Sequence, residues 1–313
     1  MISKKLEESL KKQQYALIGS HSAVKICTWT KKSIQDKDDC YKSKFYGIRS
    51  WLCCQMSPCL GCANMCIFCW RDQHTPRMSK WQGKADPPKL IIDEAIKEQK
   101  RLLSGIAGGP IFNRQKWQQA KEPMHFALSL VGEPILYPKI NQMISLLHKR
   151  GKTTFVVCNG VFPDILKKME PPTQLYMSLD APNEELWVKT DKPILKDGWK
   201  RLIKSLKVLK TLKKKTRTCI RITLIKGIND VDPEGYAKLL AIADPHFVEI
   251  KAYMFVGSSR QRLSITNMPY HEYVVEFAKK ICAASKYKII DEKRESRVVL
   301  LMKRDFKGRI MKF

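Results

Sequence analysis

The stretch Cys62-Ala-Asn-Met-Cys66-Ile-Phe-Cys69 is the part of the sequence from which fold and chemistry can best be argued. Its three cysteines follow one another closely enough for one short loop to bring three thiolates to one metal centre. Structural zinc sites and electron-transfer iron–sulfur clusters use four protein ligands. A [4Fe–4S] cluster held by only three cysteines leaves one iron open to an outside ligand. The stretch therefore favours a reactive iron–sulfur centre.

A zinc knuckle is the alternative interpretation of the same cysteines. Cys59 and Cys62 form one Cys-x-x-Cys pair, and Cys66 and Cys69 form another. Zinc sites usually place a longer loop between their two ligand pairs than the four-residue step found here. We therefore rank zinc below the iron–sulfur interpretation.

Length and composition predict a globular α/β protein. The 313 residues suffice for one large α/β domain or a barrel with additions, and 44% of them are hydrophobic. No apolar run approaches the roughly 20 residues of a membrane span. The N-terminal residues lack the apolar core of a secretory signal. We expect a soluble, cytoplasmic protein that does not enter a membrane.

The charge balance indicates a polyanionic partner. Lys and Arg number 58 against 30 Asp and Glu, which gives a formal net charge of +28. Nucleic acid is the simplest partner for such an excess, because phosphate contacts release counterions. A lysine-rich but merely solvated surface is the alternative.

The cysteines are concentrated in the first quarter of the chain. Eight of the eleven lie within residues 27–69, which in a cytosolic protein favours metal binding over disulfides. Cys27, Cys40 and Cys53 recur every thirteen residues, and Cys54 is an alternative to Cys53. Spacing alone leaves a second metal site open. The segment after Cys40 also places two lysines beside a candidate ligand.

The remaining sequence alternates between short apolar strands and helical stretches, as βα units do. The predicted strands are 51–55, 124–131, 153–158, 175–179, 218–225 and 247–254, with a final extra strand at 297–302. The predicted helices are 3–17, a helix from Pro88 onward, 138–150, 184–190, 194–213, 233–243 and 270–285. About six βα units predict a parallel sheet with right-handed crossovers. The lysines of 194–213 are interpreted as a solvated helix face.

Polar residues end five successive strands, where ligands gather in parallel sheets. The first of these ends is Gly132-Glu133, in which a glycine lets backbone approach a ligand and an acid can accept from an ammonium group. The others are Asn159-Gly160, Asp180, Asn229-Asp230 and the segment with Arg260 and Arg262. Ordinary βα turns are the alternative, but five in succession predict a ligand site.

Together, the cysteine motif and the Gly-Glu-Pro strand end resemble the radical S-adenosylmethionine (SAM) superfamily. More narrowly, several stretches resemble the archaeal-type tRNA 4-demethylwyosine synthases of the wybutosine pathway. These stretches are Cys40-Tyr-Lys-Ser-Lys-Phe-Tyr-Gly-Ile, Cys66-Ile-Phe-Cys69-Trp-Arg-Asp, Val131-Gly-Glu-Pro, Ser178-Leu-Asp180-Ala, Arg221-Ile-Thr-Leu-Ile-Lys-Gly-Ile-Asn229 and Lys251-Ala-Tyr-Met-Phe-Val-Gly. The resemblance implies a partial (β/α)6 barrel over 56–313, preceded by a cysteine-rich extension over 1–55.

The resemblance also implies roles for named residues. Two [4Fe–4S] clusters would be held by Cys62, Cys66 and Cys69 and by Cys27, Cys40 and Cys53. Lys42 matches the lysine that forms a Schiff base with pyruvate, and Lys44 is the competing candidate. SAM would be contacted by Gly132, Glu133, Asp180 and Asn229. The target base, splayed out of its loop, would be held by aromatic or Arg side chains; by position the candidates are Trp70, Arg71, Trp81, Arg260 and Arg262.

The reaction that the resemblance implies builds a third ring on N1-methylguanosine at position 37 of tRNA. As a hypothesis, a deoxyadenosyl radical from SAM takes a hydrogen from the N1-methyl group, and the carbon radical attacks pyruvate held as an imine on lysine. C–C cleavage then releases one pyruvate carbon, and the guanine amine displaces lysine. Eukaryotic relatives carry a flavodoxin-like domain that we do not find in this sequence, so we expect a separate electron donor. We also expect a monomer.

Two other functions fit parts of the sequence. An RNA methyltransferase or methylthiotransferase of the same superfamily would share the cysteine motif but would not incorporate pyruvate carbon. A zinc-stabilised RNA-binding module would share the charge but would be colourless, whereas iron–sulfur protein is brown.

Overall fold

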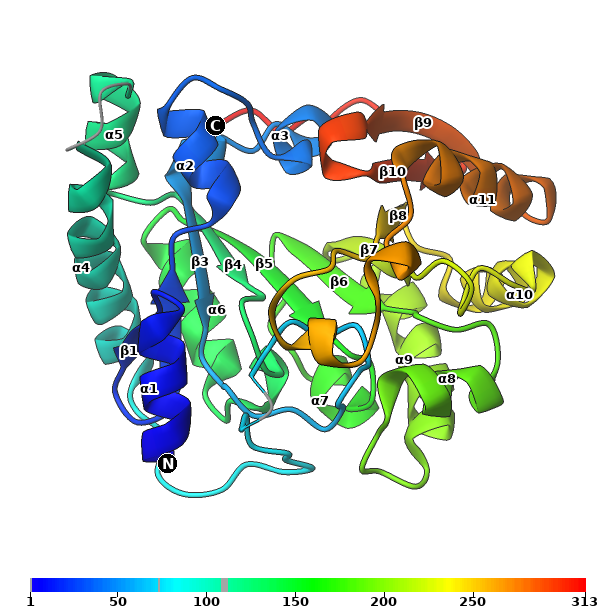
Figure 1. Cartoon of the computed structure of the whole chain (residues 1–313), viewed down its shortest axis with the longest axis horizontal. Helices are drawn as coiled ribbons and strands as arrows, with labels where there is room; N and C mark the ends of the chain where they lie inside the picture. Colours follow the sequence, from blue (N-terminus) through cyan, green and yellow to red (C-terminus); the bar gives the residue numbers. More distant parts are fainter. Residues whose placement is uncertain (1, 73, 108–111) are drawn as a thin grey trace.

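A single mixed sheet forms the centre of the computed structural model, which describes residues 2–72, 74–107 and 112–313 (Figure 1). Its strand order is β1-β2-β3-β4-β5-β6-β7-β8-β10-β9. The strands are β1 (Ala16–Ile18), β2 (Ser22–Lys25), β3 (Cys53–Ser57), β4 (His125–Leu128), β5 (Thr153–Cys158), β6 (Gln174–Ser178), β7 (Arg217–Leu224), β8 (Phe247–Ala252), β9 (Lys288–Lys293) and β10 (Val298–Met302). Strands β3 to β8 run parallel. These six strands are the predicted partial (β/α)6 barrel.

Helices follow the parallel strands and cover the outside of the barrel (Figure 1). They are α4 (Pro88–Ala107) and α5 (Arg114–Ala120) after β3, α6 (Ile140–Lys149) after β4, α7 (Pro163–Lys167) after β5, α8 (Glu184–Asp191) and α9 (Gly198–Leu212) after β6, α10 (Pro233–Ala243) after β7 and α11 (His271–Ala283) after β8. On α9 the leucines are buried and the predicted lysine stripe is exposed. In the part of the chain described, no helix is long and apolar enough to cross a membrane.

Both edges of the sheet differ from the sequence-based expectation. At one edge, a hairpin of β1 and β2 pairs antiparallel with β3, so the predicted helix 3–17 ends early, as α1 (Lys4–Lys12). At the other edge there are two added strands, since β10 pairs antiparallel with both β8 and β9. The boundary predicted between residues 55 and 56 falls inside β3. The extension and the core therefore share a strand.

The barrel interior is filled at one end by α3 (Tyr41–Tyr46). Side chains alternate between the two faces of a strand: on β8, Val248 and Ile250 join the core that also contains the outer helices, and Phe247 points to the interior. Tyr41, Phe45 and the neighbouring aromatics of α3 pack in a separate cluster with the inward residues of β4 to β8. The barrel interior is thus filled with side chains at the end where α3 lies and is not an open channel.

Candidate active site

The loop that carries Cys62, Cys66 and Cys69 leaves the carboxyl end of β3 and folds back on itself. The Cys62 amide donates to the Pro76 carbonyl (3.0 Å), and the Met78 amide donates to the Cys62 carbonyl (2.9 Å). The Cys69 amide donates to the Cys66 carbonyl (3.0 Å). These bonds fix the backbone around the three thiols at the strand ends, where the sequence predicted a ligand site.

The same loop is docked against the last turn of α8. The amides of Met65 and Ile67 donate to the carbonyls of Asp191 (3.0 Å) and Thr190 (2.8 Å). The Asp191 carboxylate accepts from the Asn64 amide group (3.2 Å) and from the Cys66 thiol (3.5 Å). Burial raises the pKa of Asp191 to about 6. Asp191 was not predicted, because helix-end acids are common and only the fold brings this one to the loop.

Arg71 and Arg262 donate hydrogen bonds to backbone carbonyls of this cysteine loop. The Arg71 guanidinium is buried and donates to the Asn64 carbonyl, and the nearby Cys62, Cys69 and Cys66 thiolates raise its pKa despite burial. The Arg262 guanidinium donates to the carbonyls of Ile67 (3.0 Å) and Cys69. Both guanidinium groups thus donate to the backbone of the cysteine loop, and their predicted contact with RNA stays a prediction.

The Gly132-Glu133 strand end lies directly against the cysteine loop. Gly132 has a φ of +74°, and a Cβ there would lie 2.1 Å from the Cys59 carbonyl oxygen, so only glycine allows this approach. The Glu133 amide donates to the Gly61 carbonyl (2.7 Å). The sequence had assigned the glycine to a ligand approach, whereas the structure shows a backbone approach.

The Glu133 carboxyl is buried and only half satisfied. Oε2 accepts from the Asn159 amide (2.8 Å), whereas Oε1 is buried without a partner. Burial raises the pKa of Glu133 to about 8, although the Asn159 and Ile135 amides and Arg71 oppose this shift. An unpaired buried acceptor costs free energy until a donor arrives. It fits the ammonium group of an amino-acid ligand such as the methionine end of SAM.

Asp180 and Asn229 connect the ends of β6 and β7 through hydrogen bonds. The Asp180 carboxylate accepts from the Thr223 amide (2.8 Å). The Asn229 side chain donates to the carbonyls of Asp180 (2.9 Å) and Thr223 (2.8 Å), and its oxygen accepts from the Ile225 amide (2.7 Å). Both amide hydrogens of Asn229 are used in this way. In this structure neither of them is free for SAM, and the direct contact of Asn229 with SAM stays a prediction.

The second cysteine triad comes together from three elements. Cys27 precedes α2 (Thr28–Ile34), Cys40 precedes α3, and Cys53 begins β3. Burial raises the pKa of Cys40 to about 11 and that of Cys53 to about 12, and the charge of Cys27 adds to both shifts. Cys54, the alternative ligand, lies in the core shared with the outer helices. Successive residues of a strand face opposite ways.

Lys42 lies in the barrel interior beside this triad. Its Nζ is 4.6 Å from the centre of the Tyr176 ring and 5.3 Å from that of Phe155. Burial and then the Arg221 charge lower its pKa. Lys44, two residues later on α3, is exposed, and its Nζ pairs with Asp291 (2.9 Å). Of the two predicted lysines, only Lys42 therefore faces the site.

A network of polar and charged side chains centred on Glu249 lies near Lys42. The Glu249 carboxylate accepts from the hydroxyls of Tyr46 (2.7 Å) and Tyr41 (3.0 Å) and from Arg221 (3.2 Å). Lys251 is half-buried, donates to the Ser296 carbonyl (2.6 Å), and has its pKa lowered to about 8 by desolvation and by the Arg221 charge. The prediction missed these roles, although Arg221 and Glu249 stand out as charges in apolar strands that pair in register.

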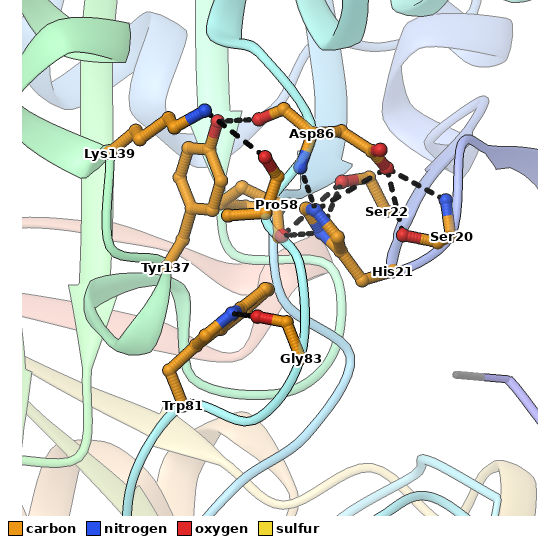
Figure 2. A network of polar contacts seen from close by, with 10 residues as sticks. Ser20, His21, Ser22, Pro58, Trp81, Gly83, Asp86, Tyr137 and Lys139 are labelled. Atoms are coloured by element: carbon orange, nitrogen blue, oxygen red, sulfur yellow. Dashed lines mark hydrogen bonds and ion pairs between the residues drawn. The ribbon is translucent and has the colours of Figure 1, made fainter.

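Trp81 belongs to a polar network outside the barrel (Figure 2). Its ring packs edge-on against His21 (4.7 Å between centroids). One nitrogen of His21 contacts the Pro58 carbonyl (2.7 Å), and the other accepts from the Asp86 amide (3.0 Å). The network joins the β1–β2 turn to both ends of the cysteine loop. Trp81 therefore has a packing role, and its prediction as an RNA contact is not supported.

Trp70 and Arg260 are the two predicted RNA residues that remain accessible. Trp70 is 42% exposed, and its indole N–H donates to the Leu130 carbonyl (3.1 Å). Arg260 is exposed, and its guanidinium carbon lies 5.4 Å from the centre of the Phe255 ring.

The donor sets suit clusters better than single ions. Among the residues described, no three His, Cys, Asp or Glu side chains are close enough to hold one metal ion, so the alternative interpretation as a zinc knuckle finds no support. A four-iron cluster is larger and can bridge cysteines that lie further apart. The Arg71 guanidinium, beside Cys62, Cys66 and Cys69, supplies the positive charge that thiolate ligands favour.

Known proteins share the sequence pattern and the fold of this chain. Residues 56–240 match the family described as "Radical SAM superfamily", and residues 242–303 match "Wyosine base formation". The S-adenosyl-L-methionine-dependent tRNA 4-demethylwyosine synthase of Pyrococcus abyssi is 46% identical over 94% of this chain and 87% of its own length. That of Pyrococcus horikoshii is 46% identical over 96% and 90%.

A solved structure of TYW1 with a lysine–pyruvate adduct bound superposes with a TM-score of 0.87 at 38% identity and covers 99% of this chain and all of that chain. The barrel and its three-cysteine loop thus define a radical SAM enzyme, which binds SAM on a [4Fe–4S] cluster. Within that superfamily, the chain belongs to the tRNA 4-demethylwyosine synthases. This assignment sets aside the methyltransferase, methylthiotransferase and zinc-module alternatives.

Proposed function

We infer that this chain synthesises 4-demethylwyosine in tRNA, with SAM and pyruvate as co-substrates and N1-methylguanosine-37 as the target. The observation that carries the proposal is Lys42, an amine enclosed in the barrel interior beside the second cysteine triad. Membership of the synthase family and the likeness to the lysine–pyruvate adduct structure support it.

Lys42 would hold pyruvate as an imine. Its amine attacks the ketone carbon, a C–N bond forms, and the carbonyl oxygen leaves as water. The attack requires an uncharged amine, and burial together with the Arg221 charge lowers the pKa of Lys42 in that direction. The Tyr176 and Phe155 rings lie beside Nζ and form an apolar wall next to the amine.

SAM would be held by Cys62, Cys66 and Cys69 through their cluster and by Glu133. When bound, this cluster supplies the electron that cleaves SAM. The free Oε1 of Glu133 would accept from the SAM ammonium group, and the neighbouring Gly132 keeps that carboxyl against the cysteine loop. Asp180 lines the same strand ends, held in place by Asn229.

We also propose that Cys27, Cys40 and Cys53 hold a second [4Fe–4S] cluster. The effect of the Cys27 charge on the pKa of both Cys40 and Cys53 supports it. Iron content after anaerobic reconstitution tests it: about eight irons per chain are expected. The triple variant Cys27→Ala, Cys40→Ala and Cys53→Ala should keep about four, and equal iron in both proteins would refute the second cluster. A separate electron donor and a monomeric state stay predictions.

An anaerobic assay tests the function as a whole. The protein is incubated with tRNA bearing N1-methylguanosine-37, carbon-labelled pyruvate, SAM and dithionite, and the nucleosides are analysed by mass spectrometry. We expect the tricyclic base to carry two labelled carbons when all three pyruvate carbons are labelled. A methylated or methylthiolated base without label would overturn the proposal.

A further inference from the structure

We propose that Trp70 and the outer surface of the loop between β8 and α11 form a stacking platform for the unpaired bases that flank the target nucleotide. The proposal rests on the proposed function, which supplies a tRNA loop as the substrate. We call this surface the stacking platform and define it by Trp70, Met254, Val256, Arg260 and Ile265.

The platform exposes an unusual amount of apolar surface. Met254 is 40% exposed, Val256 41%, Ile265 54% and Trp70 42%. Most other large apolar side chains of the barrel are buried. A group of exposed apolar side chains rimmed by polar residues marks an interaction site.

Trp70 and the loop form one continuous surface. The Ser258 amide donates to the Trp70 carbonyl (3.1 Å). Gly257 has a φ of +59°, and a Cβ there would lie 2.3 Å from that carbonyl oxygen, so the glycine lets the two backbones meet. The indole N–H is bonded to Leu130, which holds the ring in place. The ring is therefore a fixed surface, not a mobile side chain.

The charge of the platform suits RNA. Residues 254–270 include Arg260 and Arg262 but no Asp or Glu. Arg260 is exposed and lies over Phe255, which presents a planar cation to solvent. Aromatic rings and guanidinium planes are the surfaces on which unpaired RNA bases stack, and a guanidinium can also pair with phosphate. Together with the net charge of +28, this favours a single-stranded RNA loop as the occupant.

The platform is also tied to the cluster loop. Trp70 directly follows Cys69 in the sequence. Arg262, in the loop between β8 and α11, donates to the carbonyls of Ile67 and Cys69. In Figure 1 this loop, between β8 and α11, crosses beside the cysteine loop. A base stacked on Trp70 therefore has a fixed position relative to the centre where the radical forms. This would set which nucleotide reaches the barrel.

Binding of an anticodon stem–loop RNA bearing N1-methylguanosine to the reconstituted protein tests the platform. Trp70→Ala should weaken binding by roughly 5- to 150-fold, since one stacked base contributes about 1–3 kcal/mol. Trp70→Phe should restore most of the affinity. Arg260→Ala should weaken binding and lower the slope of log Kd against log salt by about one. Ile310→Ala, equally exposed but against α3, and Lys210→Ala on α9 are the matched controls.

Iron content and thermal melting of each variant show whether it is folded and loaded. If Trp70→Ala loses its cluster, Arg260→Ala decides. Wild-type affinity in both Trp70→Ala and Arg260→Ala would overturn the proposal, as would unchanged RNA binding combined with slower reduction of the cluster by a protein donor. If the wild-type protein binds the RNA through the platform but forms no tricyclic base, the proposed function fails and the platform stands.

Discussion

Lys42 and Lys44 show how two residues on one short helix acquire different chemistry. Residues two apart in a helix point to different sides. Lys42 therefore enters the barrel interior, where burial lowers its pKa, while Lys44 reaches solvent and an ion pair with Asp291. An uncharged amine is available only in the first environment.

Lys42→Ala should abolish trapping of pyruvate on the protein. Borohydride reduces an imine to a stable secondary amine, so wild-type protein with pyruvate should gain the mass of the reduced adduct. Lys42→Ala should gain none and make no tricyclic base, because the attacking amine is gone, while its SAM cleavage stays detectable. Lys44→Ala is the matched control. An adduct of wild-type yield on Lys42→Ala would refute the role of Lys42.

Glu133→Gln should weaken SAM binding to the reconstituted protein by roughly 10- to 100-fold. A charge-assisted hydrogen bond contributes about 1.5–3 kcal/mol, and the amide oxygen of Gln offers the SAM ammonium an uncharged acceptor in place of a carboxylate. Calorimetric titration with SAM measures the change. Glu170→Gln, at an exposed position, serves as the control; an unchanged affinity in Glu133→Gln would remove Glu133 from the SAM site.

Glu133 should also make the SAM-free protein less stable as the pH rises. Its pKa is raised by burial to about 8 in the folded protein, above its ordinary value of 4.5. Between these values the unfolded chain ionises while the folded chain keeps its proton, so the free energy of unfolding falls with rising pH up to about 8. Urea unfolding of SAM-free protein at several pH values from 5 to 8 should show a steeper decline for wild type than for Glu133→Gln. Parallel curves would contradict this.

The sequence predicted which residue types belong to the site better than it predicted what each does. Three cysteines with fixed spacing need only a loop, and Glu133 needs only a strand end. Asn229, Arg71 and Arg262 lie at the predicted place, but their donors are used on backbone carbonyls that only the folded chain brings within reach. Asp191 was missed for the same reason.

At the scale of elements, the parallel strands were predictable and the segments that close the barrel were not. Strands β4 to β8 are buried apolar runs, so their pattern is strong. Helix α3 is short, and its aromatic residues are typical of a strand as much as of a helix. Only the barrel interior that it fills explains its position. Strands β1 and β9 are likewise short or exposed and gain their order from pairing at the sheet edges.

The last turn of α8 should determine how well the SAM cluster is retained. Asp191→Ala removes the acceptor for the Asn64 side chain, which leaves a buried donor unpaired at a cost of about 1–3 kcal/mol. We expect lower iron content and faster loss of iron to a chelator than in wild type. Glu185→Ala, exposed on the same helix, is the control. Equal iron loss from both variants would show that α8 does not support the loop.

At the scale of the whole molecule, the effect of the net charge of +28 on RNA binding depends on where the positive side chains lie. The lysine stripe of α9 lies on the outside of the barrel, on the face away from the buried leucines. Surface charges further apart than about 10 Å are largely screened at 0.1 M salt. Positive charge should therefore strengthen RNA binding mainly where it lies near the strand ends.

The salt dependence of tRNA binding should distinguish these locations. For wild type we expect the affinity to fall roughly tenfold or more between 50 and 200 mM salt, because several phosphate contacts release counterions. A variant with Lys200→Gln, Lys204→Gln and Lys207→Gln removes three exposed charges from α9 and should keep the wild-type slope of log Kd against log salt. Filter binding across a salt series measures both slopes. If the slope for the α9 variant were smaller by about three units, the RNA would bind along α9 on the outside of the barrel. The carboxyl ends of the parallel strands would then not be its principal contact.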